Sequence, residues 1–426
     1  MASRDATTRR RRAAQGGAGE VAEATIAVLS PSRAADESAT IAPEIASRDV
    51  PQWVQVLLWG KAAGRCQFAG CNRVLWKSEV TQETHNVAEK AHIRAFSAGG
   101  PRGAVGTPTH LVNDLSNLML LCHDCHVTID KRDGPIRYTA DLLRHMKREH
   151  EDRVEVVTGI VPSLKSHVVT FGTYVGEHQA LPAFASAACA LFPHRWPAQQ
   201  LLIELGTRVG PLRDRDVGFW ATERKQQAFQ FDRQVRQAME RGLMSHLSLF
   251  ALAPQPLLID LGVRLGELTD VDVYQLHREP KGWLWPTGPV TSQVLRIDRP
   301  PFTASGAPAL VFAISANVAR ERITKVLGED AACWVITVER PHNDVLTSRD
   351  MLHDFRTLMR PLLNEIKMRH GHETPLHVFP AMPVSCAVEF GRVRSPKAEP
   401  AWHLYDEQQG QGGFVHAFTI SAGATE

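Results

Sequence analysis

Hydrophobic positions recur at different spacings in consecutive parts of the chain. Residues 1–48 are rich in Ala, Arg, Ser, Thr and Glu and contain no aromatic residue, which predicts a flexible arm. Helical spacing then predicts helices over 52–63 and 138–156, at the two ends of a module that we place at 49–157. The apolar residues that set the period of the first helix are Trp53, Val56, Leu57 and Trp59.

Beyond residue 161, short runs of β-type residues alternate with helical stretches. The predicted strands are 245–251, 270–276, 309–315, 333–339 and 377–379. The predicted helices between them are 256–266, 318–327 and 348–369. This alternation predicts α/β layering with a mostly parallel sheet. The remaining length, 158–426, is enough for one large domain or for two similar halves, about 165–300 and 301–426.

One internal similarity indicates a duplicated element. Leu201–Val217 aligns without gaps with Leu257–Val273, and eleven of the seventeen positions are identical. Each copy is predicted to form a helix, a glycine turn and the entry to a strand. A single match of this length does not establish a repeat architecture.

Composition and charge restrict the location and the partners of the protein. Of 426 residues, 43% are apolar, and 48 basic residues face 46 acidic ones, which gives a net charge of +2. Any DNA-binding surface must therefore be local rather than spread over the chain. We expect no membrane span, because no run of 18 apolar residues occurs, and the basic run Arg9–Arg12 lacks the apolar core of a secretory signal. A reducing cytoplasm is expected, with Cys189, Cys333 and Cys386 as buried free thiols.

The other four cysteines form two pairs with the spacing of a metal site. Cys66 and Cys71 are separated by four residues, and Cys122 and Cys125 by two. Four thiolates with no open position predict a structural Zn²⁺, which allows a short, loop-rich segment to fold. A zinc ribbon that only binds DNA or protein would use the same four cysteines and would need no catalytic histidine.

His92, Asn117 and His126, set among the cysteines, are the residue types that a metal-dependent phosphodiesterase needs. The segments EKAHI (89–93), NLMLLC (117–122) and Cys125-His126 resemble the HNH endonuclease family over about residues 60–135. That resemblance implies a ββα-metal fold, in which a β-hairpin and a helix surround one catalytic divalent ion such as Mg²⁺.

The resemblance also implies a role for each of these residues. His92 would be the general base, Asn117 would orient His92 and shape the loop between the strands, and His126 would bind the catalytic ion. Asp130, one helical turn after His126, would be a further ligand or orienter. Many family members carry a metal ligand directly before the base, where this chain has Ala91, so Glu89 is expected to substitute for it.

The C-terminal part shows no second catalytic signature: it has no Walker P-loop, no GxSxG and no HExxH. Loops after strand ends, together with aromatic residues beside Arg and Lys, indicate where an anionic nucleotide would bind. The candidate ligand-binding residues are Arg278, Trp285, Ser315, Asn317, Arg394, Lys397 and Trp402.

This part resembles the SAVED domain, a sensor made of two CARF-like Rossmannoid halves, through residues 245–286 and 380–406. HNH followed by SAVED resembles effectors of cyclic-oligonucleotide-based anti-phage signalling (CBASS). That resemblance implies activation by a cyclic dinucleotide, or less often a trinucleotide, from a partner nucleotidyltransferase. It also implies a homo-oligomer, a dimer assembling to a tetramer, that cleaves double-stranded DNA. Two alternatives stay open: a restriction-type HNH endonuclease whose C-terminal half reads DNA, and a non-catalytic zinc-containing sensor.

Overall fold

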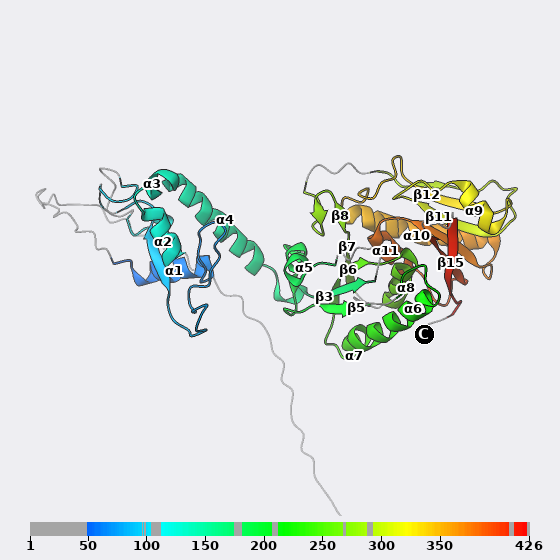
Figure 1. Cartoon of the computed structure of the whole chain (residues 1–426), viewed down its shortest axis with the longest axis horizontal. Helices are drawn as coiled ribbons and strands as arrows, with labels where there is room; N and C mark the ends of the chain where they lie inside the picture. Colours follow the sequence, from blue (N-terminus) through cyan, green and yellow to red (C-terminus); the bar gives the residue numbers. More distant parts are fainter. Residues whose placement is uncertain are drawn as a thin grey trace, which may run out of the picture.

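The computed structural model describes residues 49–423, apart from 96, 98, 104–111, 174–180, 207–211, 267–269, 288–292 and 409–412. The predicted arm at 1–48 lies outside the described residues, as does part of the segment 99–107, which is rich in glycine. Two bodies are visible, and a long helix projects from the N-terminal one toward the other (Figure 1). No described helix is long and apolar enough to cross a membrane.

The N-terminal body is a small module around one antiparallel strand pair. Strands β1 and β2 pair in the register Ala88↔Cys122 to His92↔Leu118. Every residue of β2 is buried, so this strand forms the centre of the module core. The elements in chain order are α1 (Gln52–Ala62), β1 (Ala88–His92), the 3₁₀ turn Leu115–Asn117, β2 (Leu118–Cys122), α2 (His123–Asp130), α3 (Gly134–Arg137) and α4 (Ala140–Thr158).

Helix α1 confirms the helix predicted over 52–63 but buries a different face from the one marked by its largest residues. Its buried side chains are Val54, Leu58 and Ala62, at the i, i+4, i+8 positions of a single stripe. Trp53 is 66% exposed, and Val56 and Leu57 are also exposed. The spacing of the apolar residues predicted this helix correctly, but contact with the adjacent strand Leu118–Cys122 determines which face of the helix is buried.

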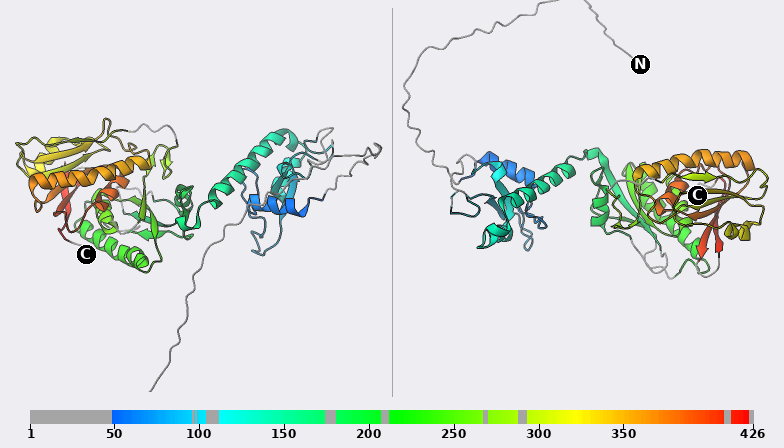
Figure 2. Two further views of the ribbon diagram at one scale, coloured as in Figure 1. Left: turned by 180° about the vertical axis from the view of Figure 1, so that it is seen from behind. Right: turned by 90° about the horizontal axis from the view of Figure 1, so that it is seen from above.

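Helix α4 confirms the second helix predicted for the module. Thr139 caps it, because the hydroxyl oxygen accepts a hydrogen bond from the backbone N–H of Leu142. Its first half packs on the module through Leu143, Lys147 and His150, whereas its last two turns bury no side chain. Figure 2 shows it leaving the N-terminal body along a straight course.

The C-terminal body contains two mostly parallel sheets, as the strand–helix alternation predicted. In the first sheet the order is β4-β3-β6-β7, with β5 also beside β3, and all of these pairs are parallel. Its elements are the 3₁₀ turn Pro162–Leu164, β3 (Lys165–Gly172), α5 (Phe184–Leu191), β4 (Trp196–Pro197), β5 (Ile203–Leu205), α6 (Phe219–Phe231), a π-helical turn (Asp232–Arg236), α7 (Gln237–Glu240), β6 (His246–Leu252), α8 (Gln255–Leu265) and β7 (Asp270–Tyr274). A hairpin of β8 (His277–Arg278) and β9 (Lys281–Gly282) follows.

The second sheet has the order β10-β12-β11-β13-β14-β15, with antiparallel strands only at its two edges. It includes β10, which precedes the division predicted near residue 300. Its elements are β10 (Arg296–Asp298), β11 (Pro308–Ala313), α9 (Arg320–Leu327), β12 (Ala332–Thr337), α10 (Arg349–His370), β13 (Leu376–Ala381), α11 (Val384–Arg392), β14 (Trp402–Gln408) and β15 (Gly413–Ile420). The strands and helices predicted after residue 245 all occur within a few residues of their expected places.

The two sheets repeat one order of connections. β5-β3-β6-β7 in the first corresponds to β12-β11-β13-β14 in the second, and α8 and α11 occupy equivalent places between the last two strands. These two helices cross in close contact. A Cβ built on Gly262 would lie 2.1 Å from the carbonyl oxygen of Val388, and one built on Gly391 would lie 2.0 Å from that of Ile259. Only glycine permits this approach of two backbones.

A matched pair of buried carboxylates lies beside the helix crossing. Asp260 on α8 bonds Arg224 and Arg264, at 3.0 and 2.9 Å, and Glu389 on α11 contacts Arg392 at 2.7 Å and Arg356 at 3.5 Å. Each carboxylate precedes its crossing glycine by two residues and follows a proline by six, Pro254 and Pro383. The spacing Pro-x5-Asp/Glu-x-Gly therefore occurs in both helices, at equivalent places in the two sheets.

The duplication predicted from Leu201–Val217 and Leu257–Val273 is wrong. In the first segment residues 203–205 form strand β5, whereas the matching positions of the second segment lie in helix α8. Similar residues adopt different structures here because neighbouring strands and helices override local propensity. Cys333 and Cys386 are buried as predicted, but Cys189 is exposed, because α5 turns that side to the surface.

Candidate metal centre and active site

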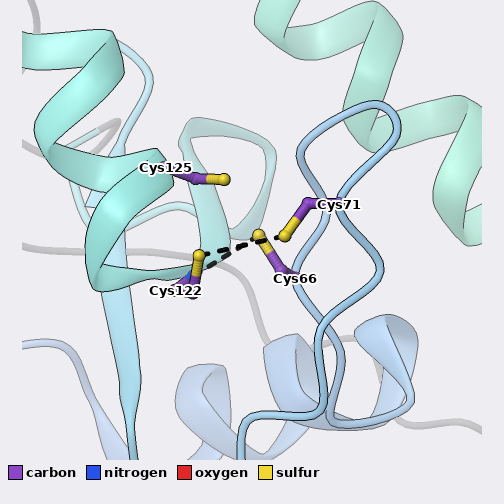
Figure 3. Close-up of side chains that lie close together, drawn as sticks. All are labelled: Cys66, Cys71, Cys122 and Cys125. Atoms are coloured by element: carbon purple, nitrogen blue, oxygen red, sulfur yellow. Dashed lines mark hydrogen bonds between the residues drawn. The ribbon is translucent and has the colours of Figure 1, made fainter.

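The structure brings the four paired cysteines together. Their sulfur atoms all lie within 4.8 Å of one another, with Cys66 and Cys71 on the loop after α1 and Cys122 and Cys125 at the start of α2 (Figure 3). The backbone N–H of Cys122 also donates to the sulfur of Cys66 at 3.4 Å. Of the described residues, only these four offer three or more ligand atoms that all lie within 4.8 Å of one another.

The electrostatics of the four thiols favour a bound cation. Burial raises the pKa of the Cys66 thiol to about 12 and also raises that of Cys125. Burial opposes ionisation of Cys122 as well, but hydrogen bonds from Cys125 and the other cysteines outweigh it and lower its pKa. Four thiols whose sulfur atoms lie this close together can all become thiolates only around a cation, and four sulfur ligands fit Zn²⁺.

A second group of polar side chains lies where β1 meets α2. The Nε2 atom of His126 lies 3.3 Å from Oδ2 of Asp130, one turn later on α2. The other ring nitrogen, Nδ1, lies 3.9 Å from Oε2 of Glu89 on β1, and His123 Nδ1 lies 3.5 Å from Oε1 of the same carboxylate. The structure therefore places His126 between Glu89 and Asp130.

The charges of this group reinforce one another. The hydrogen bond that His126 donates to the Asp130 carboxylate raises the pKa of His126 above its usual value, against the effect of burial. Burial alone would raise the pKa of Asp130, but bonds from His126 and Arg102 outweigh it and lower that pKa. The carboxylate form of Asp130 is therefore favoured in the site.

The strand period explains how Glu89 can stand in for the missing ligand at Ala91. Side chains two residues apart point to the same face of a strand, so Glu89 and Ala91 share one face, and α2 packs against this part of the pair. The carboxylate of Glu89 suits a hard divalent ion such as Mg²⁺, which binds few protein ligands and keeps several waters, whereas the imidazole of His126 is a softer ligand that also suits transition metals. His126 and Glu89 are the residues that would hold the ion.

The contacts of His92 differ from the prediction. His92 ends β1, and its Nε2 atom lies 3.5 Å from Oδ1 of Asn113 rather than against Asn117. The Asn117 side chain instead accepts from the backbone N–H of Arg94 at 2.9 Å and donates to the carbonyls of Arg94 and Val112. Asn117 thus shapes the connection between the strands, as expected, whereas Asn113, which the sequence analysis missed, is the residue beside the imidazole.

In the C-terminal body, the carboxyl ends of several strands meet at one place. The Gln255 side chain at the start of α8 donates to the carbonyl of Met382 at 2.9 Å, and the Ser385 hydroxyl on α11 donates to Gln275 at 2.7 Å. The N-termini of α8 and α11 are therefore neighbours. Ser315 lies beside them, because its backbone N–H bonds the carbonyl of Ala381 at 2.8 Å.

An apolar cavity of about 260 Å³ opens at this carboxyl edge. Its lining includes Ile314, Val338, Phe355 and Cys386, and also Val345. The β8–β9 hairpin lies close to this cavity, because the backbone N–H of Arg278 bonds Oδ1 of Asp344 at 2.8 Å. Trp285 is half-buried, with its ring 5.5 Å from that of His277, and Asn317 is exposed after β11.

The other three predicted ligand residues lie at the opposite edge of the second sheet. Trp402 begins β14 opposite Leu376, at the amino end of the parallel strands; it is 0% exposed and stacks on Phe390 at 4.6 Å. Arg394 is buried and donates to the carbonyls of Pro400 and Ser421. Lys397 is exposed in the turn between α11 and β14. The prediction that Trp402 stacks on a ligand conflicts with this placement, because the core covers both faces of its indole.

The N-terminal body thus has the features of a metal-dependent nuclease module: an antiparallel strand pair, a following helix, a His-carboxylate group at their junction and a four-cysteine cluster. Residues 66–133 match the family model for HNH endonuclease, and residues 227–420 match that for the SMODS-associated and fused to various effectors sensor domain, SAVED. The chain joins an HNH endonuclease domain to a SAVED sensor domain, as the sequence analysis predicted.

Among solved structures, the chain is similar to the Acinetobacter baumannii Cap4 SAVED/CARF-domain containing receptor with the cyclic trinucleotide 3'3'3'-cAAA. The identity is 11% and the TM-score 0.39, over 67% of this chain and 61% of that one. The Moraxella osloensis Cap4 SAVED/CARF-domain containing receptor is 12% identical with a TM-score of 0.35, over 74% of this chain and 70% of that one. This chain thus spans about three fifths of the length of the Acinetobacter receptor. No curated protein matches the sequence significantly.

Proposed function

We propose that the protein is a metal-dependent DNA endonuclease whose activity is switched on by a cyclic oligonucleotide. The observation that carries this proposal is the group of Glu89, His126 and Asp130 within the segment that matches HNH endonucleases, on the same chain as a SAVED sensor domain. The expected units are the arm 1–48, the nuclease domain 49–157 and the sensor domain 158–426, the last made of two CARF-like Rossmannoid halves.

In the proposed reaction, water attacks a DNA phosphodiester and the P–O3′ bond breaks. The leaving 3′-oxygen takes a proton from solvent water, so the products carry a 5′-phosphate and a 3′-hydroxyl. His92 accepts the proton of the attacking water, and Asn113 holds its ring at the end of β1. His126 and Glu89 are the residues that would hold a divalent ion, and the ion would supply charge stabilisation at the scissile phosphate. The zinc-type cluster fixes the start of α2 and so the position of His126.

We place the activating ligand at the carboxyl edge where α8 and α11 begin. Helix N-termini favour phosphate, and the adjoining apolar cavity is suited to part of a base. This location keeps Ser315, Asn317 and Arg278 as candidate contacts and adds Gln255, Gln275 and Ser385. Arg394, Lys397 and Trp402 lie at the other edge and are not part of it.

The biological setting follows from the HNH–SAVED combination. We propose a CBASS effector in the cytoplasm that is activated by a cyclic dinucleotide, or less often a trinucleotide, from a partner nucleotidyltransferase. Ligand binding would convert a dimer to a tetramer, so that paired nuclease domains cut both strands of DNA.

The test is plasmid cleavage with Mg²⁺, with and without a panel of cyclic di- and trinucleotides, with His92→Ala as the control. Degradation that requires one ligand and is lost in His92→Ala is the expected result. Site-specific fragments without any ligand would favour the restriction-type alternative. A chain that binds zinc and a cyclic nucleotide but never cuts would be a non-catalytic sensor.

A further inference from the structure

Arg102 is a buried cation in the nuclease domain to which the proposed reaction assigns no role. Its side chain is only 4% exposed, and its guanidinium makes three hydrogen bonds in three directions. Nε donates to the carbonyl of Ile93 at 2.6 Å, Nη1 to that of Ile129 at 2.8 Å, and Nη2 to Oδ1 of Asp130 at 2.5 Å. The backbone of Arg102 has a φ of 55°, in the left-handed region that residues other than glycine rarely adopt. The chain therefore turns at this residue instead of continuing in an extended conformation, and the turn directs the side chain toward these acceptors.

The acceptors of Arg102 belong to the two elements that carry the proposed active site. Ile93 directly follows His92 at the end of β1, and Ile129 and Asp130 form the last turn of α2, which carries His126. The carbonyls in the last turn of a helix have no partner within the helix, and a cation there also interacts favourably with the helix dipole. Arg102 therefore joins the strand of the base to the helix of the metal ligand.

Besides Arg102, the backbone of Gly134 contacts the last turn of α2, where a Cβ built on that glycine would lie 2.4 Å from the carbonyl oxygen of Ile129. Helix α2 is eight residues long, and Ile129 is its one buried side chain. Its start is tied to the cysteine cluster through Cys125. Without the guanidinium, the last turn would keep the packing of Ile129 and the contact with Gly134 but would lose the hydrogen bond to the Ile129 carbonyl.

The bond to Asp130 also determines what this carboxylate can do. Its Oδ1 atom is occupied by Arg102, and its Oδ2 atom faces Nε2 of His126. This leaves Nδ1 of His126 as the ring nitrogen that faces Glu89. Asp130 is then an orienter of the imidazole, and the alternative role as a metal ligand is not needed.

We infer that Arg102 is a positioning residue: through Asp130 it fixes the His126 ring with Nδ1 toward Glu89, and through Ile93 it fixes the end of the strand that carries His92. The inference rests on the proposed nuclease function. Lysine cannot replace the residue, because a single ammonium on a flexible stem cannot bond three acceptors that a planar fork reaches at once.

The test measures metal binding without DNA, in the full-length, zinc-loaded protein. Mn²⁺ affinity is measured by calorimetry for wild type, Arg102→Lys, Asp130→Asn and the double variant, with His126→Ala to identify the site. The matched control is Arg73→Lys, because Arg73 also contacts α2, through an exposed ion pair with Asp124 at 3.0 Å. Zinc content and thermal unfolding confirm that each variant is folded.

Arg102→Lys is expected to weaken Mn²⁺ binding about 10- to 100-fold, the usual effect of losing a residue that orients a metal ligand. Arg73→Lys should leave it unchanged. Because Arg102 acts through Asp130, the double variant should bind about as weakly as Asp130→Asn alone.

Three results would overturn the inference: wild-type affinity in Arg102→Lys, effects of the two substitutions that multiply, or no Mn²⁺ site that depends on His126. A wild-type protein that binds Mn²⁺ in this way but cuts no DNA under any ligand would instead refute the proposed function, and the inference would stand.

Discussion

Replacing Gly262 with alanine tests the contact that holds the two sheets of the sensor domain together. The new methyl group would lie 2.1 Å from the carbonyl oxygen of Val388 and 2.9 Å from the Cα of Gly391, both of them backbone atoms. No side-chain rotation can relieve such a clash, so α8 and α11 must separate. An ordinary carbon–oxygen contact is about 3.3 Å, which requires a shift of about 1 Å.

The cost of that shift exceeds the gain from a better helix former. Overpacking in a core typically costs about 1–3 kcal/mol, and a gap of about 1 Å along the interface also forfeits up to about half of its dispersion energy. The alanine returns about 1 kcal/mol of helix propensity. Overpacking alone therefore leaves a net loss of up to about 2 kcal/mol in the free energy of unfolding, and the lost dispersion energy adds to it.

The matched control is Gly60→Ala in α1, because a Cβ there would meet nothing within 4 Å. Gly60→Ala has the same gain in helix propensity but no steric clash, so it should stabilise the protein by up to about 1 kcal/mol. Urea-induced unfolding measures the free energy of unfolding of each variant. Faster hydrogen exchange in peptides from α8 and α11 would show that the stability is lost where these two helices cross. A Gly262→Ala protein as stable as wild type would refute the close backbone contact.

Four further predictions address the site and the core. Cys122→Ser should abolish zinc binding and unfold the nuclease domain alone, since a structural zinc contributes on the order of 10 kcal/mol to a small domain; zinc content and circular dichroism check this. His92→Ala should lower the DNA cleavage rate by about 10²–10⁴-fold, whereas Asn113→Ala should lower it less, about tenfold, and shift the pH profile of cleavage. Burial lowers the pKa of His246 to about 4, so as the pH falls below about 6.5 the unfolded chain takes up this proton before the folded protein does, and the folded state loses stability. Between pH 7 and pH 5 the free energy of unfolding should fall by about 2 kcal/mol from this group. Chemical denaturation at both pH values measures it, and His246→Asn should lack this part of the pH dependence. Trp402→Ala should cost about 3–5 kcal/mol of stability, and Trp402→Phe much less, with ligand affinity of the folded Trp402→Phe protein unchanged in a binding titration.

The sequence was most informative where the chemistry depends on residues close together in the chain. The cysteine spacing and the order of Glu89, His92 and His126 predicted a module that the structure assembles, because a hairpin and the next helix are local elements. Strands and helices beyond residue 245 could be predicted for the same reason: their periods are local properties.

The contacts that sequence reasoning missed are set by the tertiary fold. Asn113 and Arg102 lie in the connection between β1 and β2, where no period indicates which side chain turns inward. The aromatic and basic residues at Arg394 and Trp402 suggested a ligand site, but an indole and its cation also pack well in a core. The spacing Pro-x5-Asp/Glu-x-Gly is present in the sequence of both α8 and α11, and it would have indicated that these two helices occupy equivalent places.

Helix α4 connects the nuclease module to the first sheet of the C-terminal body. Its 19 residues extend about 28 Å, and its first half is built into the nuclease core. One short turn after it, the chain enters β3, which lies between β4, β5 and β6 in the first sheet of the sensor. A rigid rod anchored in this way acts as a lever arm, so a tilt of about 10° at the sheet would carry the nuclease about 5 Å. If the C-terminal body binds the proposed ligand, small shifts of its first sheet would therefore become larger displacements of the nuclease domain.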